Sequence, residues 1–163
     1  MRMDFREVSS DIEMEKCAAV IRDAFKTVAE DLKITKESAP TNPAFLEKDS
    51  LIRMKEKGIV MFGVFENSVQ IGFVAIEKAD TDVYYMEKLA VLPEFRHKGC
   101  GRRIMDFVFD YVSGNNGKKV SIALINENSV LINWYIDYGF TVTGTKRFNH
   151  LPFEVCFMEK PAV

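Results

Sequence analysis

A short basic segment with two spaced glycines combines the residue types that bind phosphate. It follows an apolar run over 83–92 and reads Arg96-His97-Lys98-Gly99-Cys100-Gly101-Arg102-Arg103. The apolar residues after it recur at helical spacing, at Ile104, Met105, Val108, Tyr111 and Val112. The segment is therefore expected at a helix N-terminus, where unpaired N–H groups and the helix dipole attract an anion. Glycines at 99 and 101 let a ligand approach the backbone closely.

The glycine spacing excludes two common phosphate-binding motifs. A P-loop requires G-x-x-x-x-G-K-[ST], and a dinucleotide fingerprint requires a third glycine or alanine where this chain has Ile104. What remains is Arg96-x-x-Gly99-x-Gly101 after a strand ending Leu-Ala-Val-Leu-Pro, with Pro-Glu-Phe-Arg as the lead-in. This arrangement resembles the coenzyme A pyrophosphate loop of the GNAT superfamily of N-acetyltransferases, [Gln/Arg]-x-x-Gly-x-[Gly/Ala]. The alternatives are an ordinary tight turn for the glycines and a solvated basic face for Arg96, Lys98 and Arg103.

The resemblance implies which residues contact acetyl-coenzyme A. In GNAT enzymes the loop N–H groups bind the pyrophosphate, and the preceding strand splays from its neighbour so that its main chain pairs with the pantetheine arm and the thioester carbonyl. The expected cofactor-binding residues are Leu89, Ala90, Val91, Arg96, His97, Lys98, Gly99, Cys100, Gly101, Arg102 and Asn128. The Cys100 side chain is interpreted as packing or as a passive loop residue rather than as a nucleophile.

Glu87 is the expected general base. A strand period of two places it on one face among aromatic and aliphatic side chains, Val83, Tyr85, Leu89 and Val91. Such surroundings raise the pKa of a carboxylate toward catalytically useful values. Several GNAT enzymes have a glutamate nine residues before the loop arginine, which draws a proton from the acceptor amine directly or through water. The alternatives are that a bulge turns Glu87 outward or that it pairs with a lysine. Lys88 is expected on the opposite face as a solvated neighbour.

Residues 128–140 resemble a second GNAT pattern, Asn-x-x-Ala-x-x-x-Tyr-x-x-x-Gly-Phe. The matching positions are Asn128, Tyr135 and the pair Gly139-Phe140, with Leu131 in place of the usual small residue. The resemblance implies that Asn128 contacts coenzyme A and that Tyr135 faces the sulfur and protonates the departing thiolate. A tyrosine on an apolar helix stripe is otherwise a core residue, which is how Trp134 and Tyr138 are interpreted.

Two polar connections are expected to border the acceptor site. The stretch 35–42 turns polar, and Pro40 and Pro43 block regular structure, which indicates a mobile loop. The second connection, 148–152, contains His150. In the GNAT fold the last strands border the acceptor site, so His150 can touch substrate or assist proton transfer. The alternative is that His150 is a loop histidine that has neither role, since the sequence shows no partner for it.

The elements that must position these residues form a mixed α/β sheet flanked by helices. The expected order is β-α-α-β-β-β-α-β-α-β-β, with strands over 3–8, 59–65, 69–77, 83–92, 119–125, 140–147 and 153–158. The first helix begins at a capping box of Ser10 and Glu13, and a weaker helix spans 44–57 and ends at Gly58. The order is that of the GNAT fold; the resemblance covers about 3–160 in element order and is residue-specific over about 83–140.

Length, charge and cysteine usage limit the classes of protein that fit. A chain of 163 residues suits one domain, expected over 1–163, and a net charge of −2 gives no general attraction to nucleic acid or anionic membrane. Three distant cysteines and two histidines indicate neither a metal site nor a disulfide framework. The N-terminus lacks a signal-peptide core, and no apolar run approaches 18 residues, so a cytoplasmic location is expected.

These observations predict a cytoplasmic GNAT-like N-acetyltransferase that uses acetyl-coenzyme A and needs no metal. The acetyl group is expected to move to a primary amine by direct attack in a ternary complex. A small-molecule acceptor is favoured over a protein because the chain is a minimal domain without a docking module. The alternative is a GNAT-shaped regulatory module that senses acyl-coenzyme A without catalysis, although such a sensor needs neither Glu87 nor Tyr135. A longer acyl donor, and the choice between monomer and homodimer, stay open.

Overall fold

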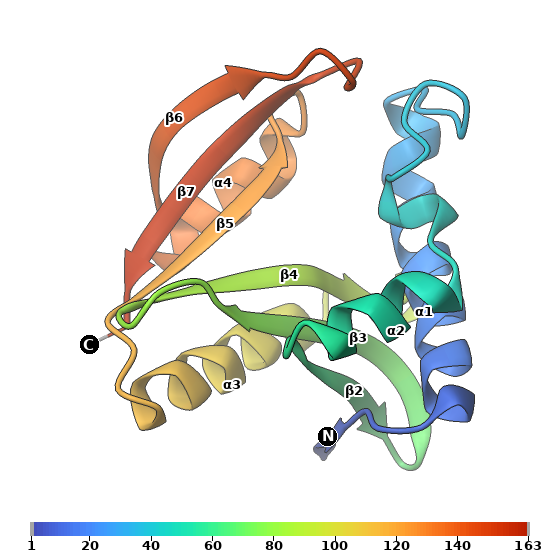
Figure 1. The fold of residues 1–163 in the computed structure, drawn as a ribbon, viewed down its shortest axis with the longest axis vertical. Coiled ribbons are helices and arrows are strands. Elements are labelled where there is room, and N and C mark those ends of the chain that lie inside the picture. The colour runs from blue at the N-terminus through green and yellow to red at the C-terminus, as the bar shows by residue number, and fades with distance from the viewer. Residues whose placement is uncertain (1, 163) are drawn as a thin grey trace.

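The computed structural model describes residues 2–162, which form a sheet of seven strands in the order β1-β2-β3-β4-β5-β7-β6 (Figure 1). The first and last residues of the expected domain lie outside this range. Strands β4 and β5 run parallel and the other neighbours antiparallel. The strands are β1 (Met3–Glu7), β2 (Val60–Glu66), β3 (Val69–Lys78), β4 (Val83–Val91), β5 (Lys119–Ile125), β6 (Thr141–Arg147) and β7 (Glu154–Pro161). The expected mixed fold and element order are confirmed.

Helices cover both faces of the sheet. Helices α1 (Asp11–Asp31) and α2 (Lys48–Glu56) pack on one face, in a core cluster with Met61, Phe73 and Ala75. Helices α3 (Cys100–Gly114) and α4 (Ser129–Tyr138) contribute to a second cluster on the other face. No helix within residues 2–162 is long and apolar enough to cross a bilayer.

Helix α1 begins at the expected capping box and ends beside a cavity described below. The Ser10 hydroxyl accepts from the Glu13 N–H at 3.2 Å, and a Glu13 carboxylate oxygen accepts from the Ser10 N–H at 2.9 Å. On its apolar face, Met14, Cys17, Ala18 and Ile21 are buried. Farther along the helix, Phe25 and Val28 are half-buried and line the cavity.

The helix expected over 44–57 is divided in two. A 3₁₀ turn, η1 (Pro43–Phe45), begins at Asn42, whose Oδ1 accepts from the Ala44 N–H at 2.9 Å. The chain is then extended at Leu46, which is buried among the α1 and α2 side chains, and α2 follows at residue 48. Burial of Leu46 and the separate cap at Asn42 explain the break, because each fixes the backbone outside a continuous helix.

Strand β4 contains a bulge that changes which side chains share a face. Glu87 pairs with Ala75 and Ala90 with Phe73, so β4 holds one residue more than β3 between these pairs. Lys88 lies at the bulge with a left-handed φ of 53°. After it, Leu89 and Val91 pack toward the α3 side, while Ala90 joins the α1 side. The expectation that Leu89 and Val91 share a face with Glu87 is therefore wrong, because one inserted residue reverses the alternation.

Strands β4 and β5 are paired only at their beginnings. Within the described sheet, the parallel ladder joins Val83–Tyr85 to Lys119–Ser121 and then stops. Figure 1 shows the two strands diverging beyond this point, with β5, β7 and β6 inclined away from β4. The splayed strand implied by the GNAT resemblance is therefore present, and the facing edges of β4 and β5 are left without a strand partner.

Candidate active site

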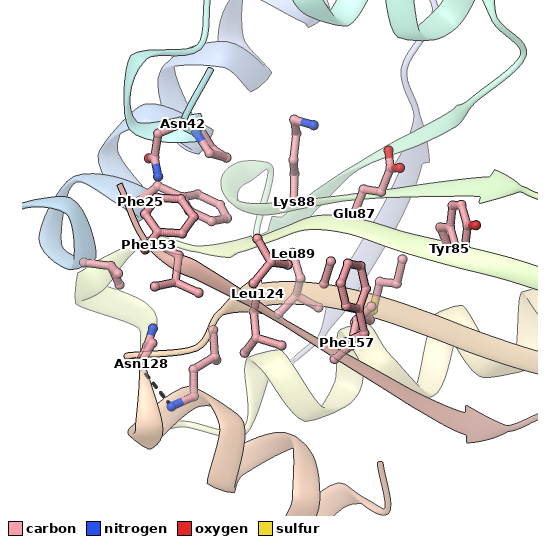
Figure 2. A pocket seen from close by; sticks show the side chains of 18 of the residues that line it. Phe25, Asn42, Tyr85, Glu87, Lys88, Leu89, Leu124, Asn128, Phe153 and Phe157 are labelled. Atoms are coloured by element: carbon pink, nitrogen blue, oxygen red, sulfur yellow. Dashed lines mark hydrogen bonds between the residues drawn. The ribbon is translucent and has the colours of Figure 1, made fainter. Parts of the chain in front are cut away.

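A cavity of about 630 Å³ lies where β4 and β5 diverge. Its walls come from α1, the segment 39–43, β4, β5, α4 and the chain around β7. Glu87 and Lys88 are the charged side chains among its lining residues in the described chain, and most of the others are apolar. Figure 2 shows these two side chains rising from β4 and the aromatic rings of Phe25 and Phe153 facing the same space. The polar connections 35–42 and 148–152 supply lining residues at Ala39, Thr41, Asn42 and Leu151.

Glu87 is half-buried at the cavity wall. Burial raises its pKa to about 7, and hydrogen bonding to the Glu77 carboxyl on β3 adds to the rise, as does charge repulsion from that group. The positive charges of Lys88 and Lys57 act in the opposite direction. The bulge does not turn Glu87 outward. Near neutral pH this carboxyl group is therefore able both to accept and to release a proton.

Tyr135 reaches the same cavity from α4. Its ring is buried and meets Trp134 and Phe140 edge-on, with centroid distances of 5.1 and 5.4 Å. Burial raises the pKa of the Tyr135 hydroxyl well above its ordinary value, so the proton is retained at neutral pH. The structure thus brings both expected catalytic side chains to one cavity, although they lie on separate elements.

Asn128 caps α4 and also lines the cavity. Its Oδ1 accepts from the Leu131 N–H at 3.2 Å, the dashed contact in Figure 2. Since the oxygen is engaged, the side-chain NH₂ group is the part that can donate to a ligand. The capping role was not predicted from the sequence, although Asn three residues before the apolar stripe is a typical helix start.

The N-terminus of α3 and the loop before it form a cradle, defined here as residues 97–102. The first hydrogen bond of α3 runs from the Arg103 N–H to the Gly99 carbonyl at 3.1 Å. Among the described residues, the N–H groups of His97, Lys98, Gly99, Gly101 and Arg102 donate to no protein acceptor. His97 and Gly99 have left-handed φ values of 61° and 81°. A run of unpaired N–H groups at a helix N-terminus suits an anion.

Gly101 has a packing role that the sequence did not reveal. A Cβ at this position would lie 2.9 Å from Cζ2 of Trp134, which is closer than side chains tolerate. At Gly99, by contrast, a Cβ would meet nothing within 4 Å, and the left-handed backbone explains the glycine. The two glycines of the motif therefore serve different purposes: Gly101 admits the indole of α4, and Gly99 allows the turn.

Arg96 binds the protein rather than projecting freely into solvent. Its Nε donates to the Val91 carbonyl at 3.2 Å and one terminal nitrogen donates to Oγ1 of Thr27 at 2.9 Å. The other terminal nitrogen donates to the Ala24 carbonyl on α1. Arg96 therefore fastens the chain before the cradle to α1 beside the cavity, and a direct contact with coenzyme A stays a prediction.

Other predicted site residues are distributed over the cradle and its surroundings. The Lys98 ammonium lies 5.6 Å from the Phe95 ring centroid, and the Arg102 guanidinium lies 5.2 Å from that of Tyr138. Of the three residues expected along the pantetheine arm, Leu89 lines the cavity, Ala90 is buried, and the Val91 carbonyl accepts from Arg96.

Neither Cys100 nor His150 is placed for chemistry in the cavity. Cys100 is buried, and burial raises the pKa of its thiol, with the negative charge of Glu66 adding to the rise. This fits the packing role predicted for Cys100. His150 is exposed, lies 5.8 Å from the Phe148 ring between centroids, and is not among the described residues that line the cavity.

Lys88 was assigned to the wrong face. It was expected as a solvated neighbour opposite Glu87, but it is half-buried and lines the cavity beside Glu87. The bulge is the reason, because it interrupts the alternation between 87 and 88. Within residues 2–162, no group of three or more His, Cys, Asp or Glu side chains is arranged to hold a metal ion.

Comparisons with known proteins agree with this architecture. A sequence model described as Acetyltransferase (GNAT) family matches residues 23–140. A comparison with curated proteins gave no match. The PaiA N-acetyltransferase from Thermoplasma acidophilum, crystallised in complex with coenzyme A, is 20% identical with a TM-score of 0.79, over 99% of each chain.

Two further solved structures show the same fold. The ribosomal-protein-S18-alanine N-acetyltransferase from Escherichia coli is 13% identical with a TM-score of 0.74, over 99% of this chain and 94% of that one. A GNAT family acetyltransferase from Elizabethkingia anophelis with acetyl-CoA bound is 18% identical with a TM-score of 0.61, over 69% and 82%.

A mixed sheet opened between β4 and β5, with a cradle at the helix N-terminus that follows β4, is the arrangement expected of an acetyltransferase. Since the family model covers most of the chain, the identification does not rest on shape alone. The chain belongs to the GNAT family of acetyltransferases.

Proposed function

We propose that the protein transfers an acetyl group from acetyl-coenzyme A to a primary amine of a small molecule. The observation that carries this proposal is that Glu87 and Tyr135, one suited to accept a proton and one suited to give it, line the same cavity. The cavity lies in the gap between β4 and β5, whose open edges can pair with an extended ligand. Family membership supports acyl transfer as the reaction class.

The donor would be held by backbone groups more than by side chains. The unpaired N–H groups of the cradle fit a pyrophosphate, and the β4 edge at Leu89–Val91, which has no strand partner there and whose Val91 carbonyl accepts from Arg96, fits the pantetheine arm. The NH₂ group of Asn128 adds a donor at the far wall of the cavity. When bound, acetyl-coenzyme A supplies the acetyl group as an activated thioester.

Glu87 in its ionised form accepts a proton from the acceptor amine as the new nitrogen–carbon bond forms. The carbon–sulfur bond breaks, and Tyr135 donates its proton to the departing thiolate. Proton exchange with solvent returns Glu87 and Tyr135 to their starting states. The net change converts an amine and a thioester into an amide and a thiol, and no acyl group is attached to the enzyme at any stage.

Residues of the segments 39–43 and 151–153 line the cavity, and we propose that they frame the acceptor. Both are connections between regular elements, which suits a surface that orders around substrate. Hydrogen exchange measured with and without both ligands should show added protection in these segments. Equal protection in the two states would remove them from the acceptor site.

We further propose that residues 1–163 act as one domain in the cytoplasm. The three cysteines are free and buried, namely Cys17, Cys100 and Cys156. Free thiols fit a reducing compartment.

The decisive experiment is release of free thiol from acetyl-coenzyme A in the presence of a panel of amines. The panel should contain a polyamine, an arylalkylamine, free amino acids and a short peptide, with mass spectrometry of the acetylated product. Amine-dependent thiol release is the expected result. If calorimetry shows acetyl-coenzyme A binding but no amine increases thiol release, the protein is an acyl-coenzyme A sensor and the proposal is overturned.

A further inference from the structure

The β4 bulge places two opposite charges next to each other in the cavity. In a regular strand, Glu87 and Lys88 would face opposite sides of the sheet. Here both side chains line the cavity, and Figure 2 shows them rising from the same side of β4. The backbone at Lys88 has a left-handed φ of 53°, which costs a non-glycine residue about 1 kcal/mol. Strain of this kind at a cavity wall points to a role for the side chain that it presents.

Lys88 has no protein partner that would satisfy its charge. Among residues 2–162, it forms no ion pair with a carboxylate within 4.0 Å, and its charge acts on Glu87 without such a contact. The side chain is half-buried beside apolar residues. An ammonium group in this position is stabilised when an anion enters the cavity.

Asn42 adds neutral hydrogen-bond donors on the same side of β4. Its Oδ1 is engaged by the Ala44 N–H at 2.9 Å, so its NH₂ group is left for a ligand. Asn42 and Lys88 together suit a carboxylate, because both offer donors and the Asn42 oxygen already accepts from the Ala44 N–H. Figure 2 places Asn42 above the aromatic pair of Phe25 and Phe153.

Apart from Thr41, Ser121, Asn128 and two tyrosines, the remaining lining residues are apolar. Phe25, Leu124, Phe153 and Phe157 line the cavity, and no second carboxylate does so among the described residues. A polyamine, which carries several positive charges, would meet Lys88 and find only Glu87 to balance them. A simple alkylamine would leave Lys88 unpaired. An acceptor with a carboxylate close to its amine satisfies both charged side chains at once.

We infer that the acceptor is a free α-amino acid with an apolar side chain. Its amine would lie at Glu87, its carboxylate at Lys88 and Asn42, and its side chain against Phe25 and Phe153. In such a molecule one carbon separates the amine from the carboxylate. This short separation suits contacts with Glu87 and Lys88, which are consecutive in the chain. This inference rests on the proposed acetyl transfer and names its substrate class.

The test compares phenylalanine with 2-phenylethylamine, which has the same ring and amine but no carboxylate. Lys88→Met removes the charge and keeps the aliphatic stem. We expect it to lower kcat/KM for phenylalanine about tenfold or more, mainly through KM, and to change the value for 2-phenylethylamine much less. Lys57→Met is the matched control, because Lys57 also acts electrostatically on Glu87 but does not line the cavity. It should affect both acceptors equally.

A second variant keeps the test valid if Lys88→Met is poorly folded. Asn42→Asp retains an oxygen that can cap η1 but replaces the donor with a negative charge. It should lower kcat/KM for phenylalanine and leave the value for 2-phenylethylamine nearly unchanged. An unchanged affinity for acetyl-coenzyme A shows that the fold is intact.

The outcomes separate this inference from the proposed function. If both variants lower kcat/KM for the two acceptors by the same factor, Lys88 and Asn42 recognise no carboxylate and the inference is overturned. Acetylation of 2-phenylethylamine without acetylation of phenylalanine, leucine or methionine also overturns it and leaves the proposed function standing. If no amine in the panel is acetylated, the proposed function and this inference are both overturned.

Discussion

The cradle and the cavity, which the proposed reaction needs together, are built from different parts of the polypeptide. The cradle uses the backbone of residues 97–102, and the proposed binding groups are the N–H groups of His97, Lys98, Gly99, Gly101 and Arg102. The cavity uses side chains from α1, β4, β5, α4 and β7, and Glu87 and Tyr135 come from different elements. Substitutions should therefore act differently in the two regions. The cradle should be sensitive to an added Cβ, and the cavity to the loss of a single functional atom.

Arg96 connects the two regions. It lies directly before the cradle and donates to Ala24 and Thr27 on α1, on either side of the cavity residue Phe25. It also donates to the Val91 carbonyl at the end of β4, at 3.2 Å. One side chain thus joins the cradle to the helix that lines the cavity, although the two regions are built separately.

The largest expected effect is in the cavity, at Glu87. Glu87→Gln removes the proton acceptor and keeps the size of the side chain, so kcat should fall about a hundredfold or more. Acetyl-coenzyme A affinity should barely change, since the cradle is untouched. Steady-state kinetics and calorimetry on the same preparation measure both quantities. A variant with wild-type kcat and pH profile would falsify the assignment of Glu87 as base.

The pH dependence follows from the pKa of Glu87, which is about 7 in the folded protein. The rate should rise as pH increases through this value, because only the ionised form accepts a proton. Tyr135, whose pKa is raised by burial, should cause no alkaline decline near neutral pH. Glu77→Gln removes the neighbouring carboxylate and should move the rise in rate to lower pH. An unshifted profile would mean that Glu77 does not contribute to the raised pKa of Glu87.

The same pKa also predicts a stability effect with a definite sign. Because the folded-state pKa lies above the ordinary value of 4.5, the native state binds the proton more tightly than the unfolded chain. The contribution of Glu87 to stability therefore decreases as pH rises from about 4.5 to 7. The Tm of Glu87→Gln minus the Tm of wild type should therefore be larger at pH 8 than at pH 4. A difference in Tm that does not vary with pH would contradict the raised pKa.

Tyr135→Phe should lower kcat by a similar order, about a hundredfold, because the ring still packs and only the proton donor is lost. Tyr138→Phe is the matched control on the same helix. The Tyr138 hydroxyl donates to Asp106 at 2.6 Å and does not line the cavity, so its loss should cost about 1 kcal/mol of stability without lowering kcat. If the two variants have equal turnover when chemistry is rate-limiting, Tyr135 is a core residue.

The cradle is tested by adding a single methyl group. Gly99→Ala and Gly58→Ala place a Cβ in open space at φ values of 81° and 86°, so both should lose about 1 kcal/mol of stability through backbone strain. Only Gly99 lies at the cradle, and only its variant should weaken acetyl-coenzyme A binding, by about tenfold. Gly101→Val is less informative, because the clash with Trp134 would disturb α4 as well. Equal Kd values for both alanine variants would argue against anion binding at 97–102.

The sequence predicted the cradle and the element order because both depend on local patterns. The helical spacing after Gly101, the capping box at Ser10 and the glycine turn are all readable over a few residues. The resemblance also placed Glu87 and Tyr135 together, in a cavity that periodicity alone does not predict. Their catalytic roles stay proposals, which the variants above test.

Two features of the site could not be predicted because tertiary structure decides them. The bulge at Lys88 has no sequence signature, since a lysine in left-handed backbone replaces the glycine or asparagine that usually marks such a turn. The roles of Gly101 and Arg96 depend on Trp134 and α1, which lie far away in the chain. A local pattern carries no information about such partners.

The smallest expected effect concerns the connection between the cradle and the cavity. Thr27→Val keeps the shape of the side chain but removes the Oγ1 that accepts from Arg96 at 2.9 Å. Arg96 retains its bonds to Ala24 and Val91, so the loss of stability should be about 1 kcal/mol. If Arg96 holds the two regions in register, the variant should also raise the Kd of acetyl-coenzyme A by a few-fold, without moving the pH profile that Glu87 sets. Ser10→Ala, which removes the α1 cap far from the site, should lower stability by a similar amount and leave the Kd unchanged. Matching changes in Kd for the two variants would mean that donor binding follows overall stability and that Arg96 transmits nothing specific.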